Sequence, residues 1–147
     1  MAMNGSRILA GGLAAGIVMN IMDFISNGVL FGERMKAESN AFKPGLGDAM
    51  AAMGGKQIAG YVIMDLVVGG ILVWAYAAMR PRFGPGPKTA VMTALAFWIF
   101  GSIVAAGYMQ MGIMSTGLWF QFGVFYLVSL LVAALVGGAV YKEDATG

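Results

Sequence analysis

The chain has no cysteine and no histidine in 147 residues, and only 11% of its residues are charged. These absences exclude disulfides, thiolate and imidazole metal sites, histidine-ligated haem, and catalysis by a cysteine or histidine side chain. The net charge of +2 is small, and the basic residues are scattered over loops, which is not typical of a nucleic-acid-binding face. We therefore expect no enzyme activity, no metal, no cofactor and no nucleic-acid partner.

Hydrophobic residues, in contrast, are abundant. They make up 59% of the chain, and the mean hydropathy is +0.79, outside the usual balance of a soluble domain. Glycine occurs 23 times, and small residues let membrane helices approach each other closely. The composition predicts an integral membrane protein whose first partner is the lipid bilayer.

Four apolar segments are long enough to cross a hydrocarbon core, which needs roughly 20 helical residues. They span residues 8–32, 57–79, 89–113 and 118–141. The predicted fold is all-α: one transmembrane domain over 1–147, a four-helix bundle that could consist of two helical hairpins. The extramembrane loop 33–56 is predicted either to form a short amphipathic helix near 48–53 or to be a flexible connector.

Four crossings place both termini on one side of the membrane. That side carries five basic residues and the other side four: Arg7, Arg80, Arg82, Lys88 and Lys142 against Arg34, Lys36, Lys43 and Lys56. Because the first loop is long and also acidic, its basic residues count for less in setting orientation. We expect a multi-pass inner-membrane protein with cytoplasmic termini.

The first span contains unusually polar residues, in "GIVMNIMDFISNGVLFG". Gly12, Gly16, Asn20, Asp23 and Asn27 follow one another at steps of three or four, so they share one face of a helix. Such a face is expected to meet protein, because a neighbouring helix can satisfy amide and carboxyl groups that lipid cannot.

The second span offers a matching face. Tyr61, Asp65 and Gly69 are spaced by four residues, and Tyr61 is one turn from Asp65. Counted from Glu33 and Lys56, Asp23 and Asp65 lie ten and nine residues into their spans, or roughly 14 to 15 Å at 1.5 Å per residue. The sequence predicts that the two acids lie at one depth.

A carboxylate at mid-membrane costs about 2.5 to 3.5 kcal/mol on insertion scales. Protonation, a shared proton, a bound cation or hydrogen bonds could satisfy the pair. One interpretation is a small permease whose proton or cation site consists of Asp23, Asp65, Asn20, Asn27 and Tyr61. The alternative is an accessory or scaffold subunit of a larger membrane complex, in which the same groups only fasten helices. No nucleophile lies beside a base, which gives catalysis no support.

Small residues also recur at four-residue spacing in the other spans. Helix-packing seams are predicted at Gly12 and Gly16, Gly101 and Ala105, and Ala133 and Gly137. Three seams exceed what one minimal bundle needs, which favours a homo-oligomer or a subunit of a membrane complex.

The opening "RILAGGLAAGIVMNIMDFISNGVLFGE" and the segment "AYAAMRPRFGPGPKTA" resemble a group of small four-span bacterial membrane proteins with no assigned function. These stretches cover under a third of the chain. The resemblance implies four spans in a bacterial inner membrane, and it implies no activity, ligand or catalytic residue.

Overall fold

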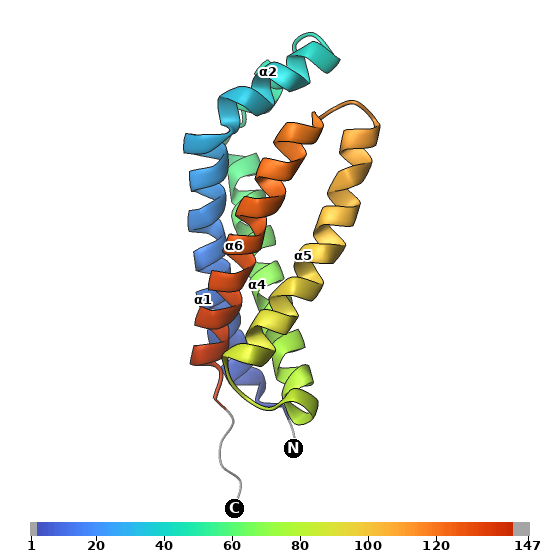
Figure 1. Ribbon diagram of the computed structural model, residues 1–147. Coiled ribbons are helices and arrows are strands. Elements are labelled where there is room, and N and C mark those ends of the chain that lie inside the picture. The colour runs from blue at the N-terminus through green and yellow to red at the C-terminus, as the bar shows by residue number, and fades with distance from the viewer. Residues whose placement is uncertain (1–2, 143–147) are drawn as a thin grey trace, which may run out of the picture.

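The computed structural model describes residues 3–142, and every regular element within that range is a helix (Figure 1). The elements are α1 (Gly5–Asp23), η1 (Phe24–Leu30), α2 (Gly32–Phe42), α3 (Leu46–Ala51), α4 (Gly55–Phe83), α5 (Pro87–Gln110) and α6 (Thr116–Val140). Here η1 is a π-helix that continues α1. The predicted all-α class is confirmed.

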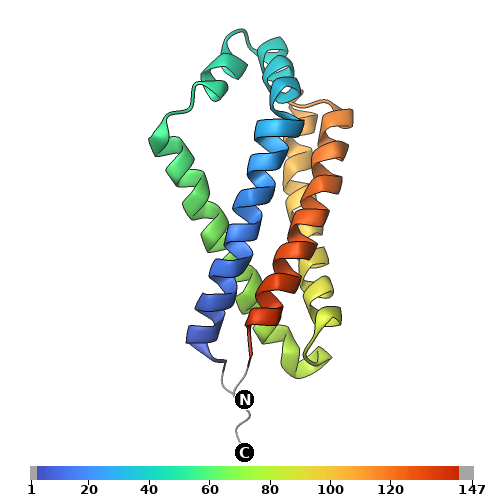
Figure 2. The same ribbon diagram turned by 90° about the vertical axis from the view of Figure 1, so that its left-hand side faces the viewer.

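Four continuous helical stretches are long and apolar enough to span a bilayer: Gly5–Leu30, Gly55–Phe83, Pro87–Gln110 and Thr116–Val140. The chain is therefore a multi-pass membrane protein with four candidate spans. The ends at residues 3 and 142 emerge at the same end of the bundle (Figures 1 and 2). We call this the terminal side, and the end that carries α2 and α3 the loop side.

The helix of the second span extends beyond the predicted span. The helix α4 continues past residue 79, through Pro81 to Phe83. The chain reverses at Gly84 and Gly86, whose φ angles of 83° and 114° suit glycine. The Tyr76 hydroxyl accepts a hydrogen bond from the Gly86 N–H at 3.0 Å, which fixes the corner to α4.

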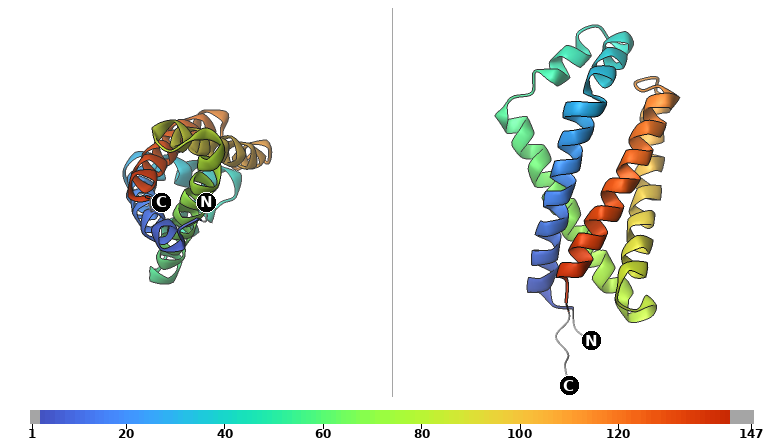
Figure 3. Two further views of the ribbon diagram at one scale, coloured as in Figure 1. Left: turned by 90° about the horizontal axis from the view of Figure 1, so that it is seen from below. Right: turned by 60° about the vertical axis from the view of Figure 1, so that its left-hand side comes forward.

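In the bundle, α1 packs between α4 and α6, and α5 packs mainly on α6 (Figure 3). The α5–α6 pair is tied by the Trp98 indole N–H, which donates to the Gly123 carbonyl at 2.8 Å. The first predicted hairpin corresponds to the α1–α4 pair and the second to the α5–α6 pair.

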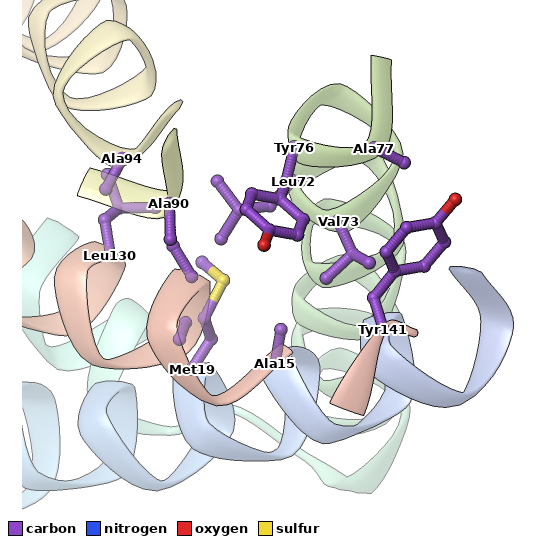
Figure 4. Packing of buried hydrophobic residues seen from close by; sticks show 12 residues of the cluster. Ala15, Met19, Leu72, Val73, Tyr76, Ala77, Ala90, Ala94, Leu130 and Tyr141 are labelled. Atoms are coloured by element: carbon purple, nitrogen blue, oxygen red, sulfur yellow. The ribbon is translucent and has the colours of Figure 1, made fainter. Parts of the chain in front are cut away.

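The buried core lies toward the terminal side. It takes residues from the second half of α1, the second half of α4, the first half of α5 and the second half of α6 (Figure 4). In α4, α5 and α6 these are the halves nearest the terminal side. Core members include Ala15, Met19, Leu72, Val73, Tyr76, Ala90, Ala94, Leu130, Ala133 and Tyr141.

Glycines set the closest helix approach in this half. A Cβ added at Gly16 would lie 2.6 Å from the Leu66 Cα, and one at Gly12 would lie 2.7 Å from the Gly70 Cα. A Cβ at Gly69 would overlap the Gly16 amide nitrogen. The backbones of α1 and α4 are thus in direct contact, as small-residue seams permit.

On the loop side α4 diverges from α1 (Figures 2 and 3). Every residue from 55 to 64 is exposed, and so is the preceding segment 51–54. The packed terminal half therefore opens into a splayed loop-side half.

The extramembrane segment contains two helices, whereas the sequence predicted at most one short helix near 48–53. The missed helix α2 contains good helix formers in "ERMKAE". It is joined to α3 by the ion pair between Lys36 and Asp48, at 3.0 Å. The Asn40 side-chain oxygen accepts a hydrogen bond from the Gly47 N–H at 2.7 Å.

A polar network fastens α2 to the start of α6. Glu38 accepts hydrogen bonds from the Ser115 N–H at 2.7 Å and from the Ser115 hydroxyl at 2.8 Å. Arg34 pairs with Glu38 at 3.0 Å and also donates to the Gln121 side chain at 2.9 Å. We call these four residues, Arg34, Glu38, Ser115 and Gln121, the loop-side clamp.

Candidate intramembrane acidic site

Asp23 lies where α1 changes into a π-helix. The segment Phe24–Leu30 has π-helical geometry, and the Phe31 N–H donates to the Ser26 carbonyl five residues back at 2.8 Å. π-Helical turns are rare and often occur at functional sites. This change could not be predicted from residue types, because "FISNGVL" has no proline and only one glycine.

Asp65 lies where α4 joins the bundle. It is the first partly buried residue of α4, and Leu66 and Gly69 beyond it pack on α1. The two acids therefore occupy the fork between the packed and the splayed halves. Each is partly buried.

The prediction that Asp23 and Asp65 lie at equal depth is wrong. Gly16 meets Leu66 at the crossing of α1 and α4. From that crossing Asp23 is seven residues toward the loop side, but Asp65 is only one residue toward it. The difference of six residues corresponds to about 9 Å along a helix. Counting from the loop ends failed because α4 begins well beyond its contact with α1.

Tyr126 of α6 completes the group. Tyr126 lies near both carboxyl groups, and Asp23 lies near Asp65. Three helices thus contribute to one cluster, which we call the acid–tyrosine cluster: Asp23, Asp65 and Tyr126. Sequence reasoning missed Tyr126, although a tyrosine in the middle of an apolar span was an available signal.

A further polar group lies beside this cluster on α6. Ser129 is one helical turn from Tyr126 and is 1% exposed. Its hydroxyl oxygen has no hydrogen-bond partner among the described residues. Unsatisfied buried hydroxyls are uncommon in folded proteins.

The predicted amides do not bind the acids' carboxylates. The Asn20 side chain donates to the Gly16 carbonyl at 3.0 Å and to the Val62 carbonyl of α4 at 3.3 Å. The Asn27 side chain donates to the backbone carbonyl of Asp23 at 3.1 Å and to the Ser26 hydroxyl at the same distance. The Asn20 side chain therefore links α1 to α4, whereas the Asn27 side chain bonds within its own helical stretch.

Tyr61 is also placed apart. It is 54% exposed, and within residues 3–142 no hydrogen bond joins it to Asp65. The carboxylates of Asp23 and Asp65 likewise accept no hydrogen bond and form no ion pair in that range. The helix-fastening role is thus carried by Asn20 and the glycines, and the acid oxygens stay available.

The predicted seams pack mostly inside the chain. Gly137 lies against α1 and α4, because an added Cβ would be 2.5 Å from the Val73 side chain and 2.9 Å from the Gly11 carbonyl. Ala133 is fully buried. Gly101 faces Tyr126, and Ala105 lines an open groove. Since these contacts use the small residues internally, the seams alone no longer argue for an oligomer.

Within the described residues, no group of three or more acidic side chains is close enough to hold a metal ion. No protein family, curated protein or solved structure matches the chain. The likeness to small four-span bacterial membrane proteins gains no support from these comparisons, and the site must be interpreted from its own chemistry.

Proposed function

We propose that this multi-pass membrane protein binds and passes protons or monovalent cations at Asp23 and Asp65. The observation that carries the proposal is that the two carboxylates are partly buried without a bonding partner among the described residues. Both are partly buried at the fork of the bundle, and within residues 3–142 neither is hydrogen-bonded or ion-paired. Acids retained inside membrane spans commonly mark ion pathways.

The divergence of α4 supports access to this level from the loop side. The ten residues of α4 that precede Asp65 are all exposed, and the last of them, Met64, is 59% exposed. An ion arriving from that side meets Asp23 first and Asp65 next, deeper along the bundle. The six-residue offset between the acids suits stepwise transfer better than simultaneous binding by both.

The alternative is an accessory subunit whose acids only fasten helices; the hydrogen bond of Asn20 to the Val62 carbonyl joins α1 to α4 without either acid. We place the protein in a bacterial inner membrane, as the resemblance of its sequence implies, with cytoplasmic termini on the balance of basic residues. Assembly into a homo-oligomer or a larger complex is part of the proposal, because four helices of a 15.3 kDa chain leave little room for an enclosed pathway.

The test is proton and monovalent-cation flux into liposomes that contain the wild type, Asp23→Asn or Asp65→Asn. We expect flux from the wild type and at least a tenfold loss in each variant. Glu33→Gln is the matched control, because Glu33 is an exposed acid at the loop-side border. It should keep wild-type flux.

Each protein must first show an unchanged oligomeric state and thermal midpoint. Wild-type flux no greater than that of empty liposomes would contradict the proposal. Equal flux in the wild type and both aspartate variants would show that the ions pass elsewhere.

A further inference from the structure

An apolar groove of about 650 Å³ lies between α4, α5 and α6. Its lining includes Val68 and Ile71 of α4, Phe100, Gly101 and Ala105 of α5, and Tyr126 of α6. The volume falls within the range of small-molecule sites. Phe100 is 72% exposed, so the groove is open toward the lipid-facing surface.

The groove approaches the acid–tyrosine cluster. Asp65 precedes Val68 by three residues on α4, which places both on one side of that helix. Tyr126, a member of the acid–tyrosine cluster, lines the groove. A ligand in the groove thus has an apolar wall along its length, and Asp65 lies about one helical turn along α4 from that wall.

The only ionisable charges inside the predicted spans are negative. The spans 8–32, 57–79, 89–113 and 118–141 contain no lysine and no arginine, and their only acids are Asp23 and Asp65. A negatively charged or neutral amphiphile would gain nothing from these acids, whereas a cation would neutralise them where the dielectric constant is low. Small divalent cations need several oxygen ligands, and among the described residues no three acidic side chains come together.

We propose that the groove binds a lipophilic organic monocation, with its apolar groups between α4 and α5 and its charge paired with Asp65. The aromatic rings of Phe100 and Tyr126 suit such a ligand, because aromatic faces attract cations. This inference rests on the proposed function and names the class of cation that the acidic site takes.

The test compares two ions of the same shape and opposite charge, tetraphenylphosphonium and tetraphenylborate, by equilibrium binding to the purified full-length protein in detergent. We expect saturable binding of the phosphonium and at least tenfold weaker binding of the borate. Asp65→Asn should weaken phosphonium binding at least tenfold.

A second variant tests the groove without changing charge. Ala105→Trp fills the groove from α5 and should also weaken phosphonium binding at least tenfold. Ala139→Trp is the matched control, because Ala139 is exposed on α6 and lies outside the groove. It should bind as the wild type does.

Equal binding of the two ions, or wild-type affinity in Asp65→Asn, would overturn the inference. If Asp65→Asn abolishes proton flux while the wild type fails to bind the phosphonium, the proposed function stands and the cation class is wrong. If both flux and binding are absent in the well-folded wild type, both fail.

Discussion

The two halves of the bundle are held together in different ways. On the terminal side, α1 and α4 touch through glycine backbones, and a cluster of buried side chains fills the space between all four long helices. On the loop side, α4 leaves the bundle, and polar contacts outside the membrane join α2 to α6. The acids lie at the boundary between these two regions.

The contrast shows how a small chain can combine a rigid base with an open site. Backbone contact at glycines leaves no space for rearrangement on the terminal side. The loop side has few buried contacts, which is typical of regions that open locally. A site at the boundary has fixed side chains on one side and access on the other.

The strongest way to break this comparison is to remove the backbone contact of the terminal half. Gly69→Ala places a Cβ against the Gly16 backbone, which cannot move aside as a flexible side chain could. We expect a loss of about 1–3 kcal/mol in the free energy of unfolding, the usual range for overpacking. Unfolding in mixed micelles with increasing dodecyl sulfate measures it.

The adjacent Gly70→Ala is a matched control, because a Cβ there meets no atom within 4 Å. It should leave stability unchanged or raise it by up to about 1 kcal/mol, since alanine is the better helix former. Equal destabilisation by the two substitutions would show that the α1–α4 contact is not the tight one.

The loop-side clamp should give a smaller effect. Glu38→Gln removes the carboxylate that pairs with Arg34 and accepts hydrogen bonds from Ser115. We expect a loss of about 1 kcal/mol in the free energy of unfolding, because the network is partly exposed. Hydrogen exchange should rise in α2 and at Ser115 but not in the terminal half of α4. Glu33→Gln on the same helix should change neither, and faster exchange throughout the bundle would contradict the separation of the halves.

The clamp should also depend on pH. Partial burial alone raises the pKa of the Glu38 carboxyl, but hydrogen bonds from Ser115 and the pairing with Arg34 outweigh it and hold the pKa below its usual value. The stabilisation is therefore present at neutral pH and is lost as the pH falls through this lowered pKa. After correction for the intrinsic pH dependence of amide exchange, the protection of α2 should fall more in acid in the wild type than in Glu38→Gln, in which only the Lys36–Asp48 pair still titrates.

A third and smaller effect is expected at the α1–α4 contact nearest the acids. Asn20→Ala removes the side chain that donates to the Val62 carbonyl, and we expect a loss of about 1 kcal/mol or less in the free energy of unfolding. Asn27→Ala is the matched comparison, because its amide bonds only within its own segment. A larger loss for Asn27→Ala would contradict the assignment of Asn20 as the interhelical link.

Hydrophobicity and glycine spacing sufficed to predict the helical class, the four spans and the contact of Gly12 and Gly16 with the second span. They could not predict the π-helix after Asp23, because local hydrogen-bond register is not encoded in apolar periodicity. The offset between Asp23 and Asp65 could not be predicted either, since it depends on where α1 and α4 cross. Tyr126 and the clamp join residues far apart in sequence, which a single chain without related sequences does not reveal.

The central claim is that Asp23 and Asp65 serve a site and do not hold the helices together. The most direct test is the free energy of unfolding of the double variant Asp23→Asn/Asp65→Asn beside Asn20→Ala. The account predicts that the double variant is as stable as the wild type or more stable, because two uncompensated intramembrane carboxylates are removed. A loss equal to or greater than that of Asn20→Ala would show that the acids fasten the helices, and would contradict the account.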